Sequence, residues 1–258
     1  MKTIFALIIA LLILFALILN FFFDSAVSVA SAQTVTTNTV DLLWEGETSI
    51  PTFYAGRPRP SAGNLVRVVA IPNVAQNGRR LETPSLVFRW VKDRNPIQSA
   101  SGKGRDLLEY RADQGGGSSI VSVEVLTNQD ERLAEARVTI TPTKPKLVLS
   151  RVAPLTSPDR ARSLMGITPI SSTETTLVAQ PFGFSLLDLA NRRVAFDWRI
   201  NGERTGAQRE DPRFFTVVAP NQGTGEVKLS VTARSEVALR QMASREITLS
   251  FGPQELNF

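Results

Sequence analysis

Few residues of this chain could carry catalysis, because the sequence contains no His and no Cys. Imidazole bases, thiolate nucleophiles and the usual ligands of zinc, copper and haem are therefore missing. A Ser–Lys pair is the remaining route to an activated hydroxyl, and Ser99-Ala-Ser-Gly-Lys103 has those ingredients. We interpret this Gly- and Ser-rich stretch as a mobile loop after a hairpin. Gly102-Lys103-Gly104 lacks the spacing of a phosphate-binding loop.

The carboxylates do not form a pattern that predicts an acid–base pair or a metal site. Asp93, Asp106 and Asp113 are scattered, and no Asp-rich calcium loop is present. Glu203 and Glu210 could face one another, but nothing in their spacing indicates the paired carboxylates of a polysaccharide hydrolase. We therefore expect no catalytic residue, no cofactor and no bound metal. A hydrolase of cell-wall polymers stays as an alternative that a carboxylate pair in a cleft would support.

Composition places the chain among ordinary folded proteins. It has 258 residues, 43% of them hydrophobic, which is enough for two domains of common size. The 29 basic and 24 acidic residues give a net charge of +5, but the chain shows no basic surface pattern of the kind that a nucleic-acid footprint needs. We therefore expect no nucleic-acid partner. Without Cys, the domains must be stabilised by their hydrophobic cores alone.

The first residues predict a membrane helix or a secretion signal. Residues 4–23 form an apolar run interrupted only by Asn20, and a helix of that length spans the roughly 30 Å hydrocarbon core of a bilayer. Lys2 precedes the run, which favours export of the remainder. Ala30-Ser31-Ala32 has the form of a signal-peptidase site. We expect residues 33–258 outside the cytoplasmic membrane, either tethered to the cell membrane or secreted after cleavage behind Ala32.

Short alternating strands with turn signals between them predict an all-β fold beyond residue 33. No segment there shows a convincing amphipathic helical pattern. In the first half, strands are expected at residues 40–44, 65–71, 86–92, 107–112, 120–127 and 134–141. In the second half, they are expected at residues 146–152, 175–180, 193–200, 214–219, 226–233 and 244–251.

Four sequence blocks of the first half return in the second half in the same order. Val68-Val-Ala-Ile-Pro72 matches Leu177-Val-Ala-Gln-Pro181 at an offset of 109, and Trp90 matches Trp198 at an offset of 108. Two later strand blocks match at the same two offsets. The nearly constant offset predicts a tandem duplication of a unit of about 105–110 residues.

The duplication sets the expected domain boundaries. Pro142 and Pro145 lie between the two sets of strands, which is typical of a short stiff linker. The expected parts are a signal peptide or transmembrane anchor over residues 1–32, a first domain over 38–141, a linker over 142–145, a second domain over 146–251 and a tail over 252–258.

Each unit has about 100 residues, six or seven short strands and a Trp on its third strand, which is the pattern of an immunoglobulin-like β-sandwich. Alternate residues of a strand share a face. We therefore expect four inward-facing core residues, which are Phe88, Trp90, Phe196 and Trp198. Asn201-Gly202 predicts a tight hairpin after the second Trp strand, whereas residues 92–96 predict a looser turn at the equivalent place.

Two stretches carry a family likeness. Phe88-Arg-Trp-Val-Lys-Asp-Arg-Asn-Pro-Ile97 resembles the C-strand and turn of immunoglobulin-like domains, and Gly223-Thr-Gly-Glu-Val-Lys-Leu-Ser-Val-Thr232 resembles a strand of polycystic-kidney-disease (PKD) type repeats of bacterial surface proteins. The paired arrangement resembles two-domain envelope proteins of candidate-phylum bacteria. The likeness covers residues 38–251 and implies a fold and an extracellular location, but no functional residue. The two Cys of antibody domains and the Gly-Asp-Gly turn common in PKD repeats are absent.

In both domains a long connection separates the first and second strands, at residues 45–64 and 153–173. Connections of this length are uncommon in compact domains unless they function or are disordered. The first one holds two aromatic residues and two Arg, the types enriched at binding hot spots: Phe53, Tyr54, Arg57 and Arg59. These four residues are a candidate partner-binding loop, but the interpretation that we favour is structural. In that interpretation, Phe53 and Tyr54 cover the open end of their own sandwich or pack at the joint between the domains.

These observations favour a non-enzymatic, extracytoplasmic binding or structural module of the cell envelope. It would contact the membrane through its N-terminal helix and recognise a protein or an envelope glycan through its loops and sheet edges. The alternative is an accessory subunit of a pilus or secretion assembly, in which edge strands pair with a partner.

Overall fold

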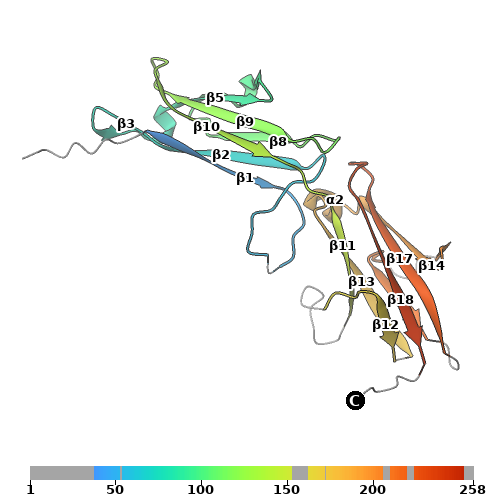
Figure 1. Cartoon of the computed structure of the whole chain (residues 1–258). Coiled ribbons are helices and arrows are strands. Elements are labelled where there is room, and N and C mark those ends of the chain that lie inside the picture. The colour runs from blue at the N-terminus through green and yellow to red at the C-terminus, as the bar shows by residue number, and fades with distance from the viewer. Residues whose placement is uncertain are drawn as a thin grey trace, which may run out of the picture. The chain divides into compact units, whose positions relative to one another are not determined.

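A computed structural model of the chain describes residues 38–52, 54–152, 162–171, 173–205, 210–219 and 224–252 (Figure 1). The predicted helix over residues 4–23, the predicted cleavage site and Phe53 lie outside these residues. Within them, no helix is long and apolar enough to cross a membrane.

The first domain is a sandwich of two antiparallel sheets, which form separate layers in Figure 1. One sheet has the order β1-β2-β8, with β1 at Thr39–Gly46, β2 at Leu65–Asn73 and β8 at Leu107–Arg111. The other has the order β10-β9-β5-β6, with β10 at Arg132–Ile140, β9 at Ser119–Leu126, β5 at Val87–Lys92 and β6 at Asn95–Pro96. The short β7, Gly102–Lys103, also pairs with β5, and β3 (Ala75–Gln76) pairs with β4 (Arg79–Arg80). Single 3-10 turns lie at Thr83–Ser85 and Gln98–Ala100.

The second domain repeats this strand order. Its smaller sheet has the order β11-β13-β16, with β11 at Lys146–Arg151, β13 at Glu174–Phe182 and β16 at Phe214–Val218. Its larger sheet has the order β12-β18-β17-β14-β15, with β12 at Ile167–Ile170, β18 at Met242–Phe251, β17 at Gly225–Ser235, β14 at Val194–Ile200 and β15 at Glu203–Arg204. One short helix, α2, covers Leu186–Ala190. The all-β fold is therefore confirmed, and each of the twelve predicted strands lies within two residues of its expected ends.

Two elements of the second domain were not predicted. The connection expected over residues 153–173 contains β12, which pairs in parallel with β18. Its partner is about eighty residues away in sequence, and Pro169 within a four-residue strand weakens the local signal, although Pro is tolerated at a sheet edge. The single turn of α2 is too short to show helical periodicity, and it begins where the Ser185 hydroxyl accepts from the Asp188 backbone N–H.

The prediction of a looser turn in the first domain is wrong. Lys92 pairs directly with Asn95, so Asp93 and Arg94 form a two-residue hairpin turn with φ of 50° and 68°. The equivalent Asn201 and Gly202 have φ of 51° and 85°, as the sequence predicts for that hairpin. Tertiary contacts override the unfavourable residue types of the first turn.

Each of the two hairpins is stabilised by an equivalent contact with a neighbouring strand. The Ile120 backbone N–H donates to Asp93 Oδ1 at 2.8 Å, and the Lys228 backbone N–H donates to Asn201 Oδ1 at 2.9 Å. In return, the Asp93 N–H donates to the Ile120 carbonyl and the Asn201 N–H donates to the Lys228 carbonyl, each at 2.8 Å. The duplication thus extends to a side-chain contact that links each hairpin to the neighbouring strand.

Trp90 and Trp198 lie between the sheets of their domains. Trp90 is fully buried and donates its indole N–H to the Arg105 carbonyl at 2.9 Å, and Trp198 donates to the Pro212 carbonyl at 2.9 Å. Phe88 is also fully buried. Phe196 differs, because it is only partly buried at the side of the second core.

Candidate functional site

The base of the long loop after β1 is bonded to the segment that follows β13. Ser49 donates its N–H to the Phe184 carbonyl at 2.8 Å, and its own carbonyl accepts from the Gly183 N–H at 2.8 Å. Its hydroxyl donates to the Pro181 carbonyl at 2.7 Å, and the Ser61 hydroxyl donates to the Gly183 carbonyl at 2.5 Å. Two Ser side chains at opposite ends of the loop therefore fix it to the second domain.

A buried Gln completes this joint. Gln241 donates its side-chain amide to the Ala62 carbonyl at 2.8 Å and to Asn64 Oδ1 at 3.1 Å, and its Oε1 accepts from the Ser185 N–H at 3.1 Å. Gln241 and Asn64 have almost no exposed surface. The base of the long loop therefore packs at the joint between the domains, through Ser49, Ser61 and Asn64.

Above this base lies a hollow of about 340 Å³, which we call the junction hollow. Its lining comes from the loop, the linker and the end of β13: Thr48, Ser49, Ile50, Pro51, Tyr54, Arg59, Thr143, Lys144, Lys146, Phe182 and Gly183. Tyr54 is 45% exposed, and Arg59, Lys144 and Lys146 are also exposed. Two of the predicted loop residues, Tyr54 and Arg59, thus line one hollow with Lys144 and Lys146, which were not among the predicted site residues.

The junction hollow is cationic. It is lined by three basic residues and no acidic one. A signal for the two Lys was present in the sequence, because they flank Pro145 in the linker directly before β11. Their closeness to Tyr54 depends on the joint.

The other two predicted loop residues have different positions. The guanidinium of Arg57 lies 5.1 Å from the centroid of the Trp44 ring, so this cation packs on its own sandwich through a cation–π contact. Phe53 lies outside the described residues. Of the predicted set, the structure therefore brings together Tyr54 and Arg59.

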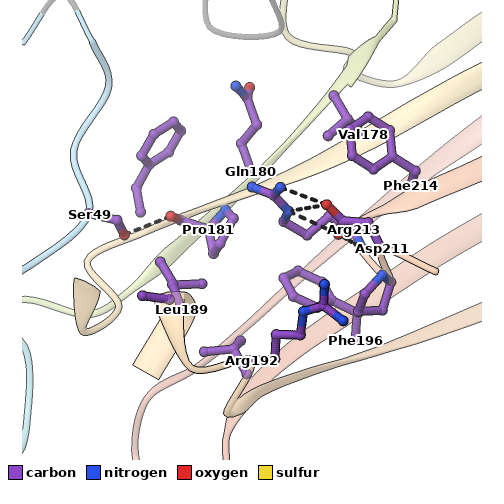
Figure 2. Close-up of a pocket in the computed structure, with 14 residues that line it drawn as sticks. Ser49, Val178, Gln180, Pro181, Leu189, Arg192, Phe196, Asp211, Arg213 and Phe214 are labelled. Carbon is purple, nitrogen blue, oxygen red and sulfur yellow. Dashed lines mark hydrogen bonds and ion pairs between the residues drawn. The ribbon is translucent and has the colours of Figure 1, made fainter. Parts of the chain in front are cut away.

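A second concavity, of about 600 Å³, lies at the side of the second domain, and Figure 2 shows it. We call it the domain-2 cleft. Its lining is Ser49, Val178, Gln180, Pro181, Phe182, Leu189, Ala190, Arg192, Val194, Phe196, Asp211, Pro212, Arg213 and Phe214. In Figure 2, Leu189, Arg192 and Phe196 lie on one side, and Val178, Gln180 and Phe214 lie on the other. Phe196 is therefore a cleft residue as well as part of the core margin.

The one carboxylate that lines the domain-2 cleft is held in its ionised form. Arg213 donates to both oxygens of Asp211, with Nη2 to Oδ2 at 2.6 Å and Nε to Oδ1 at 3.0 Å (Figure 2). This hydrogen bonding is the main reason that the pKa of Asp211 is lowered. A carboxyl with a lowered pKa is a poor general acid near neutral pH. Asp211 therefore presents a paired carboxylate to the cleft.

Of the residues that could have carried catalysis, Ser99 and Lys103 lie in regular elements and Glu210 lies beside a cation. Ser99 and Lys103 belong to a 3-10 turn and to β7 rather than to the expected mobile loop. Glu210 lies 3.7 Å from Arg192, and neither Glu210 nor Glu203 lines the domain-2 cleft. Across the residues that the structure describes, no group of three or more Asp or Glu is arranged to hold a metal ion.

Some solved structures are similar to this chain at low sequence identity. The chain is similar to the fibronectin(III)-like modules of Clostridium thermocellum CbhA, with 15% identity, 82% of this chain and 97% of that chain covered and a TM-score of 0.27. It is also similar to three N-terminal domains of the bacteriophage RB49 outer capsid protein Hoc, with 16% identity and a TM-score of 0.40, over 83% of this chain but only 59% of that one.

A third similar structure is the ectodomain of mouse nectin-like molecule 4, with 12% identity, coverage of 84% and 66% and a TM-score of 0.29. No protein-family profile and no curated protein match the chain. The neighbours are immunoglobulin-like and fibronectin-III-like, as expected for tandem immunoglobulin-like domains. Similarities this low concern the fold alone.

Proposed function

We propose that this chain is a non-enzymatic recognition module of the cell envelope, held outside the cytoplasmic membrane by its N-terminal hydrophobic segment. The junction hollow carries this proposal, because it places an exposed Tyr and three cations around one depression. Tyr and Arg dominate binding hot spots, since they combine large contact area with hydrogen-bonding or charged groups. The sequence resemblance to bacterial envelope proteins supports the location.

The architecture supports recognition at this place. A binding residue on a loop is most effective when the loop is held by a rigid scaffold. Here Thr48 and Ser49 are bonded to the second domain, and the Thr143 N–H donates to the Pro60 carbonyl at 2.7 Å. The backbone that carries Tyr54, Arg59, Lys144 and Lys146 is thus fixed at several points.

The proposal is tested by capturing a partner from envelope extract with residues 37–258 as bait. The variant bait carries Tyr54→Ser and Arg59→Gln, two changes on the rim that leave the Ser49 and Ser61 contacts in place. Replacing the whole loop would remove that joint and would confound binding with folding. The matched control bait carries Tyr110→Phe and Arg79→Gln, which lie outside the junction hollow.

A partner that binds the wild-type and control baits, but not the rim variant, supports recognition through the junction hollow. Equal capture by all three baits, with equal melting temperatures, would contradict it. Retention of the full chain in the membrane fraction, and its accessibility to an external protease in intact cells, test the proposed location separately. A chain recovered only in the cytoplasm would overturn that part.

A second candidate function, accessory subunit of a pilus or secretion assembly, is favoured by one surface feature. The outer face of the β1-β2-β8 sheet carries four exposed apolar side chains, which we call the apolar strip: Leu43, Val69, Ile71 and Leu107. Leu43 is directly opposite Val69, and Val69 is opposite Leu107. Contiguous exposed apolar residues mark interaction surfaces more often than single ones do.

Substitution of the apolar strip separates the two candidates. Leu43→Thr with Leu107→Thr removes apolar surface from positions already exposed, so the folded state is expected to keep its stability within about 0.5 kcal/mol. If an assembly partner is lost from this bait while the rim variant retains it, the accessory-subunit function gains support. If the strip variant captures the same proteins as wild type, the apolar strip no longer supports the accessory-subunit function.

A further inference from the structure

We propose that the junction hollow binds an anionic polysaccharide, with a sugar ring against Tyr54 and its carboxylate or phosphate group among Arg59, Lys144 and Lys146. This inference rests on the proposed function and specifies the ligand of the same site. It goes beyond recognition in general, because it names the chemistry that the exposed groups can satisfy.

The charges of the hollow are available to a ligand. Other surface cations are paired with carboxylates of the same chain, such as Arg67 with Glu109 at 2.7 Å and Arg89 with Asp130 at 2.7 Å. None of the ion pairs among the described residues involves Arg59, Lys144 or Lys146. Three like charges around one depression raise the local concentration of anions.

The hollow also presents apolar surface between these charges. Tyr54 and Ile50 are exposed, and Phe182 contributes a partly buried ring. An aromatic ring with a polar tip suits a ligand that is apolar on one face and hydroxylated at its edge, as a sugar ring is. The volume of the junction hollow, about 340 Å³, is near the lower limit for small-molecule sites. A short piece of a longer chain therefore fits better than a whole large ligand.

Backbone bonding at the rim favours a sugar over an acidic peptide. A peptide that binds by strand addition needs a row of unpaired backbone groups. At this rim the N–H and carbonyl of Ser49 are paired, the Thr143 N–H is paired with Pro60, and the Tyr54 N–H donates to the Pro51 carbonyl at 2.9 Å. These paired groups are not free for strand addition, which favours recognition by the side chains that here supply ring surface and positive charge.

The experiment measures binding of residues 37–258, one compact unit, to four immobilised polymers. Polygalacturonate carries carboxylates, phosphomannan carries phosphates, dextran is neutral, and poly-glutamate is an acidic peptide. We expect binding to at least one anionic polysaccharide, weaker or absent binding to dextran and poly-glutamate, and loss of affinity as NaCl is raised from 50 to 500 mM, because exposed charges are screened.

The variant Arg59→Gln/Lys144→Gln/Lys146→Gln is expected to lose about ten-fold in affinity, since each exposed charge pair contributes about 0.5 kcal/mol. The matched control, Arg79→Gln/Arg80→Gln/Lys103→Gln, removes the same charge from exposed positions outside the hollow and is expected to change the affinity less than two-fold. Tyr54→Leu is expected to weaken binding at least three-fold while the salt dependence is retained.

Several results would overturn the inference. An equal loss in the control variant would show that net charge alone matters, and equal binding of dextran would show that the ligand charge does not. Tighter binding of poly-glutamate through the same residues would make the ligand an acidic peptide. Absence of binding to all four polymers would reject the glycan, whereas a partner captured from extract through Tyr54 and Arg59 would still support the proposed function.

Discussion

Arg94 has a left-handed backbone conformation, with φ of 68°, that costs a residue with a Cβ about 1–2 kcal/mol. Its partner in the hairpin, Asp93, is stabilised by the Ile120 N–H, whereas no hydrogen bond among the described residues supports the Arg94 side chain. Arg94→Gly is therefore expected to raise the free energy of unfolding by about 0.5–1 kcal/mol, because relief of strain exceeds the added entropy of the unfolded chain. Urea unfolding at pH 7 measures this. Arg94→Ala, which keeps the strain, is the control and should give no gain.

Asp211 gives one predictable acid response at the residue scale. Its pKa is lowered, chiefly by the hydrogen bond from Arg213. A carboxyl with a lowered folded pKa stabilises the protein above its unfolded pKa of about 3.9, and this contribution is lost as pH falls through the folded value. Wild type is thus expected to exceed Asp211→Asn in stability at pH 7, with the difference shrinking below about pH 4.

Urea titrations between pH 7 and pH 3 test this expectation. Arg213→Gln should remove the same pH-dependent difference, because it deletes the donor of the same pair. A constant gap between wild type and Asp211→Asn across that range would show that the ion pair does not control the response.

At the scale of elements, the Trp of β5 connects the two sheets of the first domain. Its indole N–H reaches the Arg105 carbonyl, which lies just before β8 in the opposite sheet. Trp90→Phe is expected to cost about 1–3 kcal/mol, because the carbonyl loses its partner, and Trp90→Ala about 3–5 kcal/mol, because a cavity is added. Trp44→Phe, at a partly buried position of β1, is the matched control and should cost less than about 1 kcal/mol. Chemical unfolding followed by circular dichroism ranks the three, and equal costs at Trp90 and Trp44 would be inconsistent with this role.

At the scale of the whole described molecule, Gln241 joins the two domains. The buried amide bonds Ala62 and Asn64 of the first domain and Ser185 of the second. Gln241→Ala removes the bonds that Gln241 makes to the Ala62 carbonyl and the Ser185 N–H, with an expected cost of about 1–3 kcal/mol, whereas Asn64 Oδ1 keeps its bonds from Ser61. The unfolding of the two domains should then separate in a calorimetric scan, whereas wild type should show a single transition. Leu239→Ala, at an exposed position nearby, should leave the scan unchanged; two transitions already present in wild type would argue against coupling through this joint.

The strands, their order and the duplication followed from the sequence, because alternation of apolar and polar residues is a local signal and the Trp strand repeats at one offset. The inward positions of Phe88 and Trp90 followed from the same period of two. The sequence also indicated that Tyr54 and Arg59 belong to a loop too long for a simple connection. These conclusions need only neighbouring residues or a comparison of one half with the other.

The remaining features depend on residues that are distant in sequence. The tight turn at Asp93 needs the N–H of Ile120, and β12 needs β18 as its partner. The junction hollow exists because Ser49 donates its N–H to the Phe184 carbonyl and accepts from the Gly183 N–H, which brings Lys144 and Lys146 beside Tyr54. No local pattern encodes such pairings, because their free energy is gained only when both segments are already folded. The sequence alone therefore determined the two sandwiches, and the tertiary structure decided which of their exposed residues line one hollow.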